Sequence, residues 1–152
     1  MKHVVMRVYV YPQLPIRYND RNVVILKYSG VKAYEYFFNI DKDDMDTIEN
    51  IAESLVEIIV DAKMRAKNRK IPTKVEIFTY LVHTIRDGNL VVRQQTLDYY
   101  IFIPRGKLIS VDSYISNVKN ADPEFLSIMN TIRYIIDEEI KRPMYKIPGR
   151  VK

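Results

Sequence analysis

The strongest constraint on the fold is the apolar periodicity of residues 46–67. Apolar side chains recur there at helical spacing: Ile48, Ile51, Ala52, Leu55, Ile58, Ile59, Ala62 and Ala66. This spacing places them on one face of an α-helix. Asp46, followed by Glu49 three residues later, is typical of a helix start, and Pro72 prevents the helix from continuing. The sequence therefore predicts one long amphipathic helix that ends near residue 67.

A different period precedes this helix. Residues 3–11 alternate, with Val4, Met6, Val8 and Val10 on one face, which is the pattern of a half-buried strand. A turn-rich connection, PQLPIRYNDR, follows it. Residues 22–30 and 33–40 then read as two more strands around Ser29-Gly30. The first forty residues therefore predict a three-stranded antiparallel meander.

A second helix is predicted from residue 123 to residue 140. Asp122 is a good N-cap residue, and Pro123 suits the first helical position. Pro143 ends the pattern. The inward side chains share helical spacing and are Phe125, Ile128, Met129, Ile132, Ile135, Ile136 and Ile140.

Residues 74–87 fit two different elements. Alternation of Val75, Ile77 and Thr79 through Ile85 favours a strand, whereas Val75, Phe78 and Leu81 through Ile85 also form a helical stripe. Asp87-Gly88-Asn89 is then either a hairpin tip or a helix stop. Strands are expected at 89–95, 98–103 and 107–111. The fold class is α+β, with an N-terminal α+β half at 1–72 and a C-terminal mixed α/β half at 73–152.

Several kinds of chemistry are disfavoured by composition. The chain has no Cys and only two His, so thiol chemistry is excluded and a histidine metal site is not expected. No phosphate-binding glycine loop or nucleophile elbow is present. His83 is expected to be a structural, half-buried residue, and no cofactor is expected. Because no apolar run approaches membrane-spanning length, we expect a cytoplasmic protein without membrane contact. The composition, rich in Ile, Tyr and charged residues, resembles that of hyperthermophile proteins.

Positive charge is concentrated in two segments. Residues 141–152 hold five basic residues and no acid, which equals the whole net charge of +5: Lys141, Arg142, Lys146, Arg150 and Lys152. A second basic run extends from residue 63 to residue 74. Such clusters bind nucleic-acid phosphates, but they also occur as solvated surfaces, and bases at a helix end complement its dipole. Both interpretations stay open.

The stretch 80–106 carries a resemblance to a known family. The matching residues are Tyr80-Leu81-Val82, Ile85-Arg86, Gly88 with Val91-Val92, Asp98-Tyr99 and Arg105-Gly106. Read as a helix followed by a strand, they resemble the central signature of the archaeal tRNA-splicing endonuclease family. The resemblance implies that residues 74–87 are helical and that 73–152 is an endonuclease-like half with a basic tail at 141–152.

The family's activity sets further expectations. It cleaves bulge-helix-bulge RNA without a metal, using a Tyr, a His and a Lys. These positions fall on Phe102, near Asp112 and near Lys141, so two of the three groups are missing here. The resemblance therefore implies a structural, non-catalytic subunit that pairs with a catalytic subunit in a heterotetramer. The basic residues of 141–152 would contact tRNA or another RNA.

Two other interpretations remain. A meander, a helix and the strand KVEIFTY in residues 1–80 resemble the ribonuclease H fold. The two-metal chemistry of that fold needs carboxylates on its first and fourth strands. This chain offers Val and Tyr on the first and Tyr80 at the end of the fourth, so such a protein would also be inactive. The third interpretation is a non-enzymatic scaffold protein, viral or archaeal, with the basic tail as its contact point.

Overall fold

The computed structural model describes residues 2–12, 14–18, 23–27, 31–40, 45–85 and 87–141, with the backbone alone at 14–18 and 23–27. The elements, in chain order, are β1 (Lys2–Pro12), β2 (Leu14–Tyr18), β3 (Val23–Lys27), β4 (Lys32–Asn39), α1 (Met45–Arg69), β5 (Thr73–Thr84), β6 (Leu90–Arg105), β7 (Leu108–Tyr114) and α2 (Pro123–Ile140). The α+β class is confirmed.

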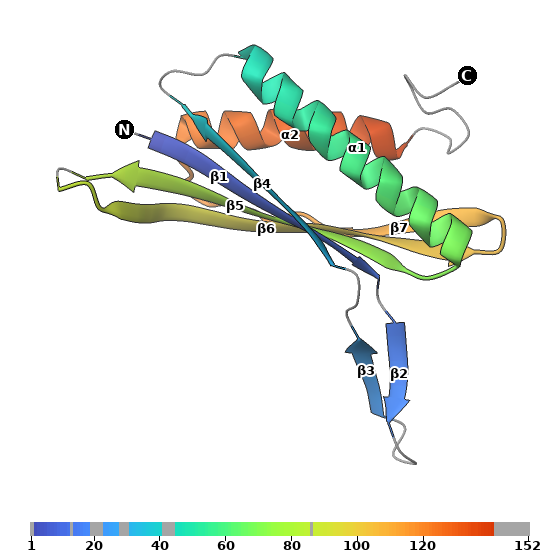
Figure 1. The fold of residues 1–152 in the computed structure, drawn as a ribbon. Coiled ribbons are helices and arrows are strands. Elements are labelled where there is room, and N and C mark those ends of the chain that lie inside the picture. The colour runs from blue at the N-terminus through green and yellow to red at the C-terminus, as the bar shows by residue number, and fades with distance from the viewer. Residues whose placement is uncertain are drawn as a thin grey trace.

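A five-stranded antiparallel sheet forms one layer, in the order β4-β1-β5-β6-β7. Both helices pack on the same face of this sheet (Figure 1). Since β4 and β5 each run antiparallel to β1, they are parallel to one another. The chain therefore needs a crossover between them, and α1 is that crossover.

The predicted meander at the N-terminus is wrong. β3 pairs with β2 in a separate two-stranded sheet, and β1 lies between β4 and β5. The residues that read as a turn-rich connection supply β2, which pairs with β3 from Leu14 opposite Lys27 to Tyr18 opposite Val23. The same finding removes the meander on which the ribonuclease H-like arrangement of residues 1–80 depends.

Residues 74–87 do not form the helix that the family resemblance implies. Residues 74–84 belong to β5, which is hydrogen-bonded along its length to β1 on one side and to β6 on the other. Its alternate residues Thr73, Val75, Ile77, Thr79 and Leu81 are buried under the helices. The helical stripe was an equally good local pattern. The strand forms because its backbone hydrogen-bonds to a neighbouring strand on each side.

Asp87-Gly88-Asn89 is accordingly the tip of a β-hairpin. Ile85 N donates to Asn89 O at 2.9 Å, and Gly88 N donates to Ile85 O at 2.9 Å. Gly88 has φ 83°, a conformation that glycine adopts without steric cost. The Asp87 side chain accepts bonds from both nitrogens of Asn89, at 3.2 and 2.7 Å. This turn connects β5 to β6.

The core lies between the sheet and the two helices. It contains the even-numbered residues of β1, from Val4 to Val10, and the apolar stripes of α1 and α2. Phe102 and Phe125 are its large aromatic side chains with no exposure. Because β1 and β5 come from the two predicted halves, residues 1–72 and 73–152 share one sheet and one core.

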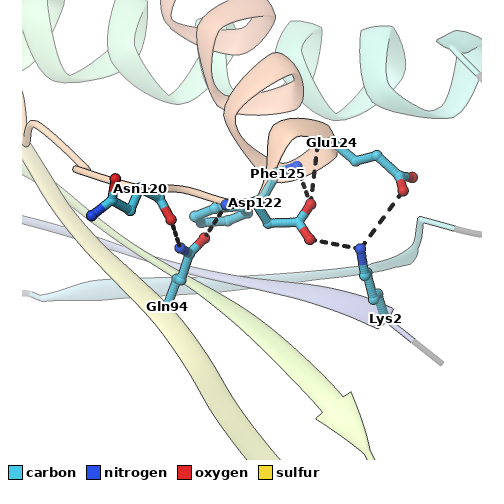
Figure 2. A network of polar contacts seen from close by, with 6 residues as sticks. All are labelled: Lys2, Gln94, Asn120, Asp122, Glu124 and Phe125. Atoms are coloured by element: carbon cyan, nitrogen blue, oxygen red, sulfur yellow. Dashed lines mark hydrogen bonds and ion pairs between the residues drawn. The ribbon is translucent and has the colours of Figure 1, made fainter.

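A polar network attaches the start of α2 to the sheet (Figure 2). Asp122 caps the helix by accepting from Glu124 N and Phe125 N at 3.1 and 3.2 Å. Lys2 Nζ lies 2.6 Å from the other Asp122 oxygen. Gln94 on β6 accepts from Asp122 N at 3.0 Å and donates to Asn120 O at 3.2 Å. The predicted cap is therefore confirmed, and it also fixes where α2 lies over the sheet.

Candidate nucleic-acid interface

The face of the five-stranded sheet opposite the helices is rich in aromatic side chains. No described helix lies over it (Figure 1). Strand pairing places alternate residues of all five strands on this surface, which we call the open face. Its aromatic members are Tyr9, Tyr11, Phe37, Phe78, Tyr80, Tyr99 and Tyr114.

Rings on the open face are paired across strands. Tyr9 and Phe78 meet edge to face, with centroids 5.8 Å apart. Tyr99 and Tyr114 are stacked at 5.6 Å. Tyr114 is 51% exposed, so one side of the second pair is open to solvent. An exposed, pre-ordered ring of this kind can stack on a nucleobase, because every base has a π-face.

Cations lie over several of these rings. Lys74 Nζ is 4.5 Å from the centroid of Tyr99 and 5.8 Å from that of Tyr11. Arg7 Cζ is 5.9 Å from the centroid of Tyr80. Acids partner both cations: Arg7 bonds Glu35 at 3.0 Å, and Lys74 bonds Glu76 at 3.2 Å. The open face is therefore aromatic and close to neutral rather than strongly basic.

One end of the sheet is basic, however. The pairs Val10 with Lys32, Pro12 with Thr73 and Thr73 with Phe102 bring the end of β1 and the starts of β4 and β5 close to the end of β6. The last turn of α1 precedes β5 at this end, and the β6–β7 turn closes it (Figure 1). We call it the basic end, and its members are Lys32, Lys67, Arg69, Lys70, Lys74, Arg105 and Lys107.

The basic end holds most of the second basic run, but not all of it. Lys63 is buried, and its Nζ donates to Ile140 O at 3.5 Å, which joins α1 to the end of α2. Burial lowers the pKa of Lys63. Arg65 pairs with Asp61 one turn earlier at 3.3 Å. Arg105, by contrast, ends β6 and Lys107 lies in the turn after it, in a segment that the charge pattern did not single out.

The three family positions are not brought together. Phe102 is completely buried under the helices, whereas Asp112 lies on the open face of β7, opposite Ile101. Lys141 follows α2 and pairs with Asp137 at 3.1 Å and Glu138 at 3.7 Å. The hydrogen bond that Lys141 donates to Asp137 raises the pKa of Lys141. These residues therefore form no common site.

The remaining predicted RNA contacts, Arg142, Lys146, Arg150 and Lys152, lie outside the described residues. His83 is half-buried at the end of β5, in the environment expected for it. The sequence reasoning named Asp98 only within the family resemblance and missed its pairing with Arg133, a buried bidentate contact at 2.8 and 3.0 Å. Their separation of 35 residues on two elements left no local signal.

Among the described residues, no helix has the length and apolarity needed to cross a membrane. In the same part of the chain, no cluster of three or more His, Asp or Glu side chains is arranged to hold a metal ion. No family model, no curated protein and no solved structure shows a significant match to this chain.

Proposed function

We propose that this chain is a non-catalytic nucleic-acid-binding protein that holds a single strand, in the first place RNA, on its open face and basic end. The observation that carries the proposal is the stacked pair Tyr99–Tyr114 with Lys74 beside it, where the open face meets the basic end. Rings stack on bases while neighbouring cations neutralise phosphates.

Two features favour the binding of single-stranded over double-stranded nucleic acid. The open face extends across five β-strands, and its aromatic rings can stack on bases only if those bases are unpaired. Its charges are internally paired, so affinity for the regular phosphate array of a duplex would come from the basic end alone. We therefore expect binding to depend on stacking as well as on salt.

Fluorescence anisotropy with a labelled single-stranded oligouridine tests the proposal. Tyr99→Leu removes the ring and should weaken binding by about 1–3 kcal/mol. Tyr99→Phe keeps the ring and serves as the matched control, with affinity close to that of the wild type. Lys107→Gln, at the exposed basic end, should weaken binding and reduce the log–log salt slope by about 0.7. Lys119→Gln, outside both surfaces, is the charge control.

No binding of any single strand by the wild-type chain would contradict the proposal. Equal losses in Tyr99→Leu and Tyr99→Phe would assign the effect to the hydroxyl and would remove stacking as its basis. A duplex bound as tightly as a single strand would leave the basic end as the whole interface.

A narrower form of the proposal follows from the resemblance in residues 80–106. In it, the chain is the structural subunit of a tRNA-splicing endonuclease and positions a catalytic partner on bulge-helix-bulge RNA. The open face, with Phe37 61% exposed and Tyr114 51% exposed, offers a surface for such a partner. The β5–β6 hairpin differs from the helix that the resemblance implies, so the support is limited to the matching residues.

Co-expression tests the narrower form. A catalytic subunit that carries the missing Tyr and His should form a stable heteromer with this chain and cleave bulge-helix-bulge RNA, while this chain alone leaves the RNA intact. Cleavage by the purified chain alone would contradict the non-catalytic assignment. Failure to form a heteromer would remove the splicing role and leave the broader proposal standing.

A further inference from the structure

A second candidate site lies on the helix side of the sheet, away from the open face. A cavity of ≈ 450 Å³ opens between α2 and strands β6 and β7. Cavities of this size hold small organic ligands. Its lining includes three apolar side chains, and its polar members are Tyr100, Ser113, Asn130, Arg133, Tyr134 and Asp137.

Tyr100 is the most buried of the polar residues that line the cavity. It is only 4% exposed, and no hydrogen bond of its hydroxyl is found among the described residues. A ligand in the cavity can therefore accept a hydrogen bond from this hydroxyl. Burial and the neighbouring Asp98 carboxylate raise the pKa of Tyr100. The hydroxyl therefore stays protonated and is able to donate.

The charges around the cavity are already compensated. Arg133 donates hydrogen bonds from Nε and one terminal nitrogen to Asp98, at 2.8 and 3.0 Å. Asp137 is paired with Lys141 at 3.1 Å. A charged ligand would lose hydration without gaining a free counter-charge, which is unfavourable in a partly closed site. The ligand that fits is neutral.

We propose that this cavity binds one nucleobase, either free as a nucleoside or as an unpaired base of a strand. A base is planar and uncharged, and its edge both donates and accepts hydrogen bonds, as do Ser113 and Asn130. Tyr134, which lines the cavity and is 66% exposed, supplies an aromatic surface for the ring. The strand-borne case rests on the proposed single-strand binding, but the free-nucleoside case does not.

Titration with adenosine, cytidine and uridine, followed by ¹H–¹⁵N NMR, tests the inference. At least one nucleoside should shift amide signals of 111–115 and 130–140 at millimolar concentration while leaving β1 and β4 unchanged. Tyr100→Phe should lower the affinity for that nucleoside about fivefold to tenfold, because one hydrogen bond is lost. It breaks no hydrogen bond between described residues. Tyr99→Phe, which removes a hydroxyl from the opposite face, should bind as the wild type does.

The outcomes separate the two proposals. If no nucleoside shifts these signals, or if Tyr100→Phe binds with wild-type affinity, the cavity inference is overturned and the cavity holds only solvent. Oligouridine binding in the Tyr99 series is measured separately and is unaffected by that result. If nucleosides bind but oligonucleotides do not shift the amide signals of residues 111–115, the ligand is a free nucleoside. If nucleosides and oligonucleotides both shift these signals, the ligand is an unpaired base of a nucleic-acid strand.

Discussion

At the scale of single residues, the most consequential contact is one that the sequence does not reveal. Asp98 is 2% exposed on β6, where a carboxylate is costly to bury. Two nitrogens of Arg133 on α2 bond its two oxygens, and Ser116 N donates to it at 3.0 Å. The carboxylate is thereby satisfied, and α2 is attached to the sheet at a defined position.

We predict that Arg133→Met destabilises the protein by about 3 kcal/mol, because it leaves the Asp98 carboxylate buried without a counter-charge. Urea unfolding followed by circular dichroism measures the change. Arg105→Met, at the exposed end of β6, is the control and should change stability by about 0.5 kcal/mol or less. The double change Asp98→Leu with Arg133→Met should recover most of the loss. A loss in Arg133→Met as small as that of the control would show that the pair does not stabilise the fold.

At the scale of elements, α2 is positioned by its first turn. The hydrogen bond from Lys2, followed by bonds from the backbone of Phe125 and Glu124, lowers the pKa of Asp122 below its ordinary value of 3.8. A depressed carboxyl pKa means that the unfolded chain binds the proton more tightly than the folded one. The stabilisation is therefore complete above the unfolded value and is lost as the pH falls through the folded value.

We expect Asp122→Asn to flatten the acid side of the stability profile. Asn is also a good N-cap residue, so the helix start is kept while the titrating group is removed. Thermal melts between pH 2 and pH 7 should show the wild type losing more stability below about pH 4 than the variant does. Asp112→Asn, on the open face, is the matched control. Parallel profiles for Asp122→Asn and the wild type would refute this account of the cap.

At the scale of the whole molecule, a single layer of two helices covers one face of the five-stranded sheet. The helix side of the sheet is buried, whereas Phe37 and Tyr114 on the open face are 61% and 51% exposed. The crossover through α1 forces this arrangement, because β4 and β5 lie on either side of β1 and run parallel to one another. The two proposed binding surfaces follow from it, one on the open face and one beside α2.

Several features were predictable from local patterns. The helices around Leu55 and Ile132 have apolar spacing that repeats over five and four turns, and Asp122 with Pro123 is an unambiguous start. Each pattern depends on residues close together in the chain. β1 was predicted for the same reason, because its alternation is uninterrupted from Val4 to Val10.

The remainder depends on pairing between distant residues. Residues 74–85 carry both a strand and a helix pattern, and the pairing of Ile77 with Val8 and Asp98 decides between them. The predicted meander is wrong because β3 pairs with β2, which lies in the segment between β1 and β3, and not with β1. The Asp98–Arg133 pair, the open face and the basic end likewise unite side chains that no local period relates.

By itself, the sequence determined two amphipathic helices, an amphipathic first strand, an α+β class and a basic excess in residues 141–152. Tertiary structure alone decided that 73–84 is a central strand, that Asp87-Gly88 is a hairpin tip, and that Phe102 is a core residue. The physical reason is that periodicity records only which side of an element is apolar. Which backbone pairs with which, and which face stays uncovered, is set by contacts between elements far apart in the chain.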